Sequence, residues 1–114
     1  ESIPLDTGSV DTVVSTWTLC SIPELERALG EMRRVLKPGG QLLFLEHGRA
    51  PDPGVARWQD RLAPLFRGLA GCNPNLPMDD LIEGSGFRFA EIERVYFEGP
   101  KFISWHFIGR AVPA

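Results

Sequence analysis

The feature that most constrains the fold of this chain is a strand, a helix and a second strand in direct succession. Residues 10–15 (Val-Asp-Thr-Val-Val-Ser) are rich in β-branched side chains, which favours a buried strand. Apolar residues then recur at helical spacing: Leu25, Leu29, Met32 and Leu36. Pro38-Gly39-Gly40 ends this helix. The segment 41–46 that follows contains the unbroken apolar stretch 42–45, which suits a strand that is covered on both faces. We therefore predict a right-handed βαβ crossover, in which the two strands lie parallel in one sheet.

Local signals also predict where the helices begin. Ser21 and Glu24 match a capping box, so the first helix is expected to start near residue 22. Asp52-Pro53 predicts the N-terminus of a second helix, which Pro64 should kink. The apolar face expected for this second helix consists of Val55, Trp58, Leu62, Leu65 and Leu69.

The last third of the chain predicts a short helix and two strands. The helix covers residues 78–83 and ends near Gly86. Residues 87–97 and 102–108 flank the turn-like segment 98–101, which predicts an antiparallel hairpin. The expected fold class is α/β, with a parallel βαβ unit followed by helices and a terminal antiparallel hairpin. All 114 residues are expected to form a single domain, because we find no linker or internal repeat.

Composition excludes several classes of function. The apolar content of 43% is enough for a real core, while the net charge of −3 without a Lys/Arg-rich run argues against nucleic-acid binding. No apolar run approaches the roughly 20 residues of a membrane span, and residues 1–7 do not resemble a signal peptide, so we expect a cytoplasmic protein. Cys20 and Cys72 show no metal-ligand or disulfide spacing, and we expect two reduced thiols and no metal.

Polar residues follow both strands of the βαβ unit, where ligands bind in open α/β sheets. Residues 15–20 follow the first strand, and Glu46, His47 and Arg49 follow the second. His47 is the side chain best suited to take or give a proton near neutral pH. In the structural alternative, Glu46 and Arg49 pair with each other or cap the next helix, and His47 is a half-exposed loop residue.

Other candidate residues have structural alternatives as well. Trp17 could stack on a flat ligand or close the core. Cys20 could have a lowered pKa beside the helix cap or be a small buried filler. His106 is expected to be a satisfied histidine of the core or sheet edge. Core packing is favoured over a substrate lid for three further residues: Trp58, Phe66 and Met78.

Several segments together resemble class I S-adenosylmethionine-dependent methyltransferases of the UbiE-like, methyltransferase type 11 group. The match is closest to its methyltransferase-like 7 branch. Residues 3–6 and 9–11 resemble the stretch that leads into the family's fourth strand, and residues 33–40 (Arg-Arg-Val-Leu-Lys-Pro-Gly-Gly) resemble the turn into its fifth strand. The resemblance extends to the remaining marker segments: Glu46-His47, residues 56–60, residues 81–87 and the closing hairpin.

This resemblance implies a methyltransferase with a Rossmann-like sheet that uses S-adenosylmethionine. It places one group of residues near the adenine, namely Glu1, Ser2 and Ile3, and a second near the methionine part of the cofactor, namely Ser15, Thr16 and Trp17. Glu46 and His47 would face the substrate as catalytic residues, with His47 as general base. The implied acceptor is a small, apolar molecule such as a thiol, a quinone or a lipid-like compound.

The family's glycine-rich cofactor loop and its acidic ribose-binding residue have no counterpart in this sequence. The chain therefore corresponds to the substrate-side, C-terminal half of the domain, and we expect it to be inactive alone. The strand at residues 10–15 would have an open edge, so we expect a homodimer or a strand-swapped assembly. Two other functions are a non-catalytic binding or assembly module and a nicotinamide enzyme; the closing hairpin and Lys37-Pro38-Gly39-Gly40 argue against the nicotinamide enzyme.

Overall fold

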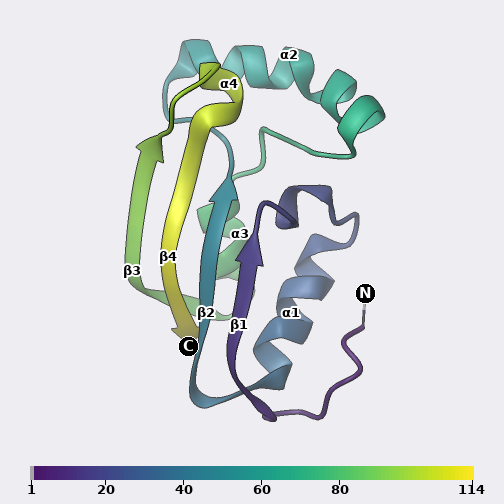
Figure 1. The fold of residues 1–114 in the computed structure, drawn as a ribbon, viewed down its shortest axis with the longest axis vertical. Coiled ribbons are helices and arrows are strands. Elements are labelled where there is room, and N and C mark those ends of the chain that lie inside the picture. Colours follow the sequence, from purple (N-terminus) through teal and green to yellow (C-terminus); the bar gives the residue numbers. More distant parts are fainter. Residues whose placement is uncertain (1) are drawn as a thin grey trace.

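The sheet has four strands, and helices pack on one face and across one end of it (Figure 1). The computed structural model describes residues 2–114, with backbone only for residues 70 and 102. In chain order, the elements are β1 (Val10–Thr16), the 3₁₀ turn η1 (Leu19–Ser21), α1 (Leu25–Val35), β2 (Leu36–His47), α2 (Pro53–Ala70), α3 (Met78–Gly84), β3 (Phe87–Tyr96), α4 (Lys101–Ser104) and β4 (Trp105–Pro113). The strand order is β1-β2-β4-β3.

The parallel βαβ unit predicted from the sequence is confirmed. β1 pairs in parallel with β2, and β4 pairs in antiparallel fashion with both β2 and β3. Thr16 is aligned with Leu45, so the carboxyl ends of β1 and β2 lie at the same edge of the sheet. The loops after these two strands are therefore neighbours, as the sequence argument required.

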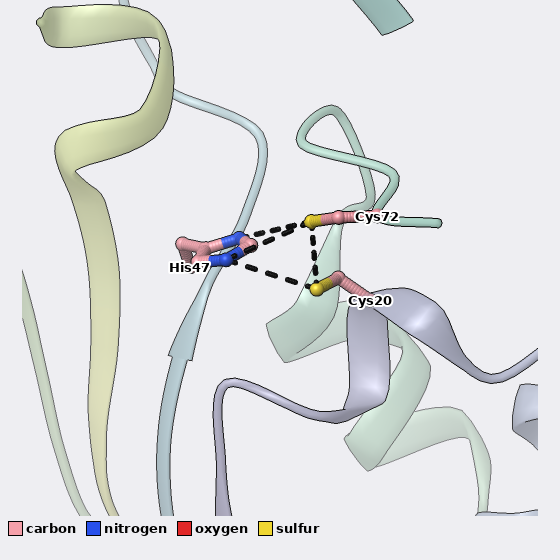
Figure 2. Close-up of side chains that lie close together, drawn as sticks. All are labelled: Cys20, His47 and Cys72. Atoms are coloured by element: carbon pink, nitrogen blue, oxygen red, sulfur yellow. Dashed lines mark hydrogen bonds between the residues drawn. The ribbon is translucent and has the colours of Figure 1, made fainter. Parts of the chain in front are cut away.

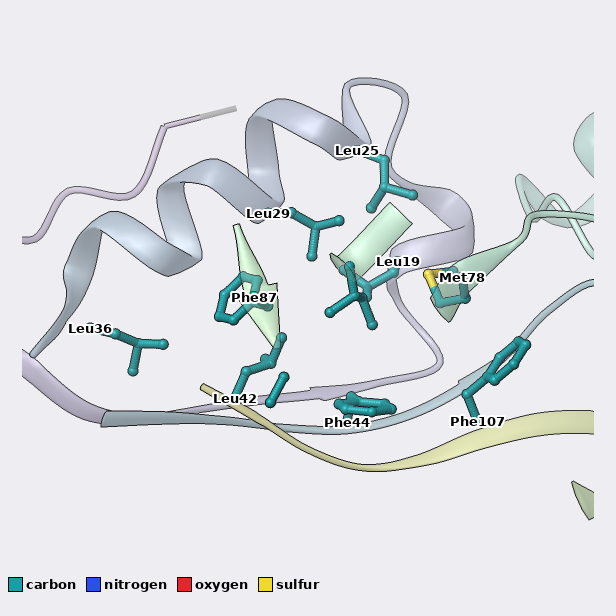
Figure 3. Packing of buried hydrophobic residues seen from close by; sticks show 11 residues of the cluster. Leu19, Leu25, Leu29, Leu36, Leu42, Phe44, Met78, Phe87 and Phe107 are labelled. Atoms are coloured by element: carbon teal, nitrogen blue, oxygen red, sulfur yellow. The ribbon is translucent and has the colours of Figure 1, made fainter. Parts of the chain in front are cut away.

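The core lies between the sheet and the helices α1 and α3 (Figure 3). Its fully buried residues include Leu19, Leu29, Leu42, Met78 and Ile82. Each such side chain contributes roughly 1.5–3 kcal/mol through removal from water. This packing fixes the face of β2 that carries Leu42, and with it the direction of every side chain along that strand.

The first helix begins later than predicted. α1 starts at Leu25 with Glu24 as its N-cap residue, so Ser21 does not form the predicted capping box. Ser21 instead ends η1, whose buried residues Leu19 and Cys20 anchor the turn in the core. β2 also starts directly after α1, so the Pro-Gly-Gly segment lies within the strand. Gly39 has a φ of 82°, which glycine adopts readily, and the pairing with β1 is irregular at this point.

Helix α2 has the predicted N-terminus, but a different face of the helix is buried than the one predicted. The side chain of Asp52 accepts a hydrogen bond from the Gly54 backbone N–H, which confirms the N-cap. Trp58 is 57% exposed and Leu69 is 80% exposed, so the predicted apolar face does not form core. The buried face consists of Ala56, Gln59 and Ala63. Small residues on this face allow α2 to lie close across the end of the sheet (Figure 1).

The terminal strands are antiparallel neighbours, as predicted, but their connection is longer than expected. β4 begins at Trp105, and the preceding residues form α4. The Phe97 backbone N–H donates to the Ser104 carbonyl at 2.7 Å, which closes the connection. Residues 102–104, predicted as the start of the strand, belong to α4 instead.

Candidate functional site

Glu46 is the central buried residue at the carboxyl edge of the sheet, with no exposed surface. Its Oε1 accepts hydrogen bonds from Ser15 Oγ at 2.7 Å and from the backbone N–H groups of Thr18 and Leu19 at 3.2 and 3.3 Å. Its Oε2 has no hydrogen-bond partner among the described residues. Burial raises the pKa of the Glu46 carboxyl, against the opposing effect of these three hydrogen bonds. Glu46 therefore holds the loop after β1 in place.

Arg49 does not pair with Glu46, so the predicted ion pair between these two residues is wrong. Its guanidinium binds both carboxylate oxygens of Asp60 on α2, with Nη2 at 3.0 Å from Oδ2. Asn75 also donates to Asp60, at 3.1 Å. These contacts join the segment after β2 to α2 and to the loop that follows α2.

His47 lies next to two cysteine side chains from distant parts of the chain (Figure 2). Its Nε2 is 3.7 Å from Cys20 Sγ and 3.7 Å from Cys72 Sγ, and the two sulfur atoms are 2.8 Å apart. Cys20 is on η1, while Cys72 follows the end of α2. The backbone N–H of Asn73 donates to the Cys20 carbonyl, which docks the Cys72 loop against η1.

The three side chains perturb one another. The hydrogen bond from Cys72 lowers the pKa of the Cys20 thiol, and His47 lowers it further, against the effect of burial. The same hydrogen bond and burial raise the pKa of Cys72. The hydrogen bond with Cys20 raises the pKa of His47. These shifts favour the thiolate form of Cys20 and the protonated form of His47.

Trp17 is 53% exposed, so the prediction that it closes the core is wrong. It has a φ of 49°, a conformation that non-glycine residues rarely adopt. Its indole N–H donates to His106 Nε2 at 2.9 Å, and His106 Nδ1 donates to the Ser104 carbonyl at 2.8 Å. His106 is therefore a satisfied histidine, as predicted, and burial lowers its pKa. Its ring also packs edge-on against His47, with centroids 5.9 Å apart.

The N-terminal candidates lie elsewhere. The Ile3 backbone N–H donates to Glu31 at 3.2 Å, and its carbonyl accepts from Arg34, so this residue rests on α1. Ser2 is exposed beside it, and Glu1 lies outside the described residues. The structure joins Ser15 to Glu46 directly and Trp17 to His47 through the ring of His106. Thr16 ends β1 with an exposed side chain, and Ile3 takes part in none of these contacts.

Gln59 is a buried residue of the site that the sequence did not indicate. Its Oε1 accepts from the Ala50 backbone N–H, and its Nε2 donates to the carbonyls of Gly48 and Pro74. It thereby connects α2 to the loops that carry His47 and Cys72. Two signals could have identified it: its place in the marker segment 56–60, and its position between two alanines on one face of α2.

The remaining lid candidates have different environments. Met78 is fully buried in the core, as predicted, and Phe66 is partly exposed. Trp58 stands on the outer side of α2, where the Arg61 guanidinium lies over its ring at 5.7 Å. The structure therefore gives Trp58 neither a core role nor a contact with His47.

The parallel strand pair with polar loops at its carboxyl edge and the antiparallel terminal strands match the sheet of Rossmann-like methyltransferases. The chain is a relative of the class I S-adenosylmethionine-dependent methyltransferases, which confirms the resemblance found in the sequence. Residues 1–44 match the family described as a methyltransferase domain.

Individual relatives extend this similarity over nearly the whole chain. The chain is 35% identical over 112 residues to thiol S-methyltransferase TMT1B of Homo sapiens, covering 92% of this chain and 44% of that protein. It is 42% identical over 60 residues to the ubiquinone/menaquinone biosynthesis C-methyltransferase UbiE of Methylobacterium nodulans, covering 53% of this chain and 24% of that protein.

A solved structure shows the same fold. An S-adenosylmethionine-dependent methyltransferase of Thermotoga maritima, described as a possible histamine N-methyltransferase, aligns with a TM-score of 0.69 at 22% identity. The alignment covers 99% of this chain and 60% of that one. The chain spans less than half the length of TMT1B. No helix in residues 2–114 has the length and apolar character needed to cross a membrane.

Proposed function

We propose that the protein containing this chain transfers a methyl group from S-adenosylmethionine to a small acceptor, and that the acceptor is a thiol. The observation that carries this proposal is the His47 site at the carboxyl edge of the sheet, in a chain related to methyltransferases. Similarity to a thiol S-methyltransferase over 92% of the chain supports the acceptor class.

The residues after β1 suit a cofactor. Thr16 has an exposed hydroxyl and Trp17 an exposed indole ring, at the edge where α/β folds bind ligands. Ser15 is buried, and its hydroxyl donates to Glu46, so it supports this edge from behind. The buried Glu46 Oε2 lacks a hydrogen bond within the described residues, so a donor from a bound molecule would complete its environment. When bound, S-adenosylmethionine supplies an electrophilic sulfonium methyl group. Ser2, Ile3 and Glu1 stay predicted cofactor contacts.

We assign different roles to His47 and Glu46. His47 is half-buried, and in its neutral form it accepts the proton that the acceptor loses. The contact with Cys20 raises the pKa of His47, so this role requires a pH at which the imidazole is deprotonated. Glu46 acts as a positioning residue: its Oε1 fixes the Ser15–Leu19 loop through three hydrogen bonds. The protein thus contributes alignment of donor and acceptor and exclusion of water.

A second candidate acceptor is a quinol-type ring, because 60 residues of the chain are 42% identical to a quinone C-methyltransferase. The match to a thiol S-methyltransferase extends over 112 residues, and this longer match favours the thiol acceptor. An apolar acceptor, a homodimer and a cytoplasmic location stay predictions.

The test uses the full-length protein, S-adenosylmethionine carrying a labelled methyl group, a panel of small thiols and a quinol. We expect methyl transfer to thiols, and we expect His47→Gln to lower kcat about 100-fold, in line with the loss of a general base. The control is Arg88→Gln at an exposed position of β3. Cofactor affinity, measured by calorimetry, should be the same in His47→Gln and wild type.

Three results would change the proposal. Methylation of the quinol alone would assign the second candidate. Full activity of His47→Gln would remove His47 from proton transfer. Failure of the full-length protein to bind S-adenosylmethionine would favour a non-catalytic binding module.

A further inference from the structure

We propose that Cys20 and Cys72 are a reversible oxidation site, in which a peroxide joins them as a disulfide beside His47. The two sulfur atoms are in direct contact at 2.8 Å, although 52 positions separate the residues in sequence. Both cysteines are free in this structure. The bond itself does not depend on methyl transfer; only its effect on activity rests on the proposed function.

The geometry favours a disulfide over a metal centre. Cys20, His47 and Cys72 form a group whose ligand atoms lie within 4.8 Å of one another. A tetrahedral zinc ion with Zn–S bonds of about 2.3 Å would hold two sulfurs about 3.8 Å apart. The observed separation of 2.8 Å is shorter than this, and the group offers three ligands where a closed structural zinc site needs four.

The surroundings prepare one sulfur as nucleophile and the other as resolving thiol. Cys72 donates to Cys20, and His47 lies at the same distance from both. These contacts lower the pKa of Cys20 and so favour its thiolate. Cys72 is half-buried and gives the pair a side open to solvent, while Cys20 is buried. Peroxide is small enough to use such an opening.

The reaction balances in two steps. The Cys20 thiolate attacks one peroxide oxygen, the O–O bond breaks, and the leaving hydroxide takes a proton from the His47 imidazolium to form water. Cys20 is then a sulfenic acid. The Cys72 sulfur attacks the Cys20 sulfur, an S–S bond replaces the S–O bond, and the displaced hydroxyl leaves as water with the Cys72 proton. Hydrogen peroxide is reduced to two water molecules, and the dithiol is oxidised by two electrons.

The disulfide would couple two segments that now touch only through non-covalent contacts. It would tie η1 to the loop after α2, where the Asn73 backbone already binds the Cys20 carbonyl. It would also convert the Cys20 thiolate, which lies next to His47, into an uncharged disulfide sulfur. We expect higher thermal stability, because a long loop is closed. We also expect slower methyl transfer, because the His47 ring loses a contact that orients it toward the acceptor.

The experiment treats the reduced full-length protein with hydrogen peroxide, digests it without reduction and identifies cross-linked peptides by mass spectrometry. We expect one Cys20–Cys72 peptide pair, lighter by two hydrogen atoms than the separate peptides, and its loss after dithiothreitol. The oxidised protein should have a Tm several degrees higher and a methyl-transfer rate several-fold lower. Cys20→Ser and Cys72→Ser, used as matched variants, should show neither cross-link nor Tm shift.

The readouts separate the two proposals, because the cross-link and the Tm do not require activity. Oxidation of Cys20 to the sulfinic acid without a cross-link would overturn the disulfide. So would a zinc ion that purifies with the protein, is lost in both serine variants and blocks peroxide. A cross-link with no change in the rate of an active enzyme would overturn the link to His47 alone.

Discussion

At the residue scale, Glu46 combines complete burial with three accepted hydrogen bonds. Glu46→Gln keeps a carbonyl oxygen for the same donors and should leave stability nearly unchanged. Glu46→Ala leaves the backbone N–H groups of Thr18 and Leu19 without their acceptor and should cost about 3 kcal/mol. Urea unfolding of the full-length variants measures the difference. Equal stability of the two variants would show that these hydrogen bonds contribute little.

Gly48, next to His47, is a second residue whose identity the packing dictates. A Cβ at this position would lie 2.6 Å from the Phe107 ring and 2.8 Å from the Leu76 carbonyl oxygen. Gly48→Ala should therefore destabilise the protein by about 2 kcal/mol through overpacking.

The matched control is Gly30→Ala on α1, where a Cβ would meet nothing within 4 Å. This change should stabilise the protein by about 0.7 kcal/mol, because alanine is the better helix former. Thermal unfolding of both variants tests the pair, and a destabilised Gly30→Ala or an unaffected Gly48→Ala would contradict the packing described.

At the scale of elements, α2 is tied to the sheet edge by the ion pair of Asp60 with Arg49. The Arg49 hydrogen bonds, with a further one from Asn75, lower the pKa of Asp60 to about 2. A carboxyl whose pKa is lower in the folded state stabilises that state above its unfolded pKa, and the contribution is lost as the pH falls toward 2. Asp60→Asn should thus be less stable than wild type at pH 7.

The difference in urea midpoint between wild type and Asp60→Asn should shrink steadily on acidification below the ordinary carboxyl pKa. The pair is solvent-exposed, so the effect should be small and should weaken further in high salt. A difference that stays constant with pH would assign the effect of the variant to packing.

At the scale of the whole molecule, β1 is an edge strand of the sheet formed by residues 2–114, with β2 as its neighbour on one side. Val14 on this strand is 68% exposed. Unpaired strand edges recruit further strands, so the 114-residue chain expressed alone should form dimers. Light scattering after size exclusion measures the mass. Val14→Lys should shift the chain toward monomer, whereas a wild-type chain that is entirely monomeric would contradict the prediction.

The sequence alone determined the βαβ unit, the N-terminus of α2 and the antiparallel closing strands. Each of these depends on local signals: the β-branched run at residues 10–15, the N-cap of Asp52 and the turn-forming segment 98–101. The local pattern of strands and loops also placed Glu46 and His47 at one edge with the loop after β1. The motifs that resemble the methyltransferase family identified which α/β fold these elements form.

Only the tertiary structure decided which side chains meet at that edge. Cys72 contacts Cys20, which is 52 positions away in sequence. Arg49 pairs with Asp60 and not with Glu46, although Glu46 is closer in sequence. The outward face of α2 was wrongly predicted because helical spacing identifies an apolar stripe but does not say what covers it. The cysteine contact, the Arg49–Asp60 pair and the buried face of α2 have the same physical reason. Each depends on packing between segments that are far apart in sequence, so local sequence patterns do not predict it.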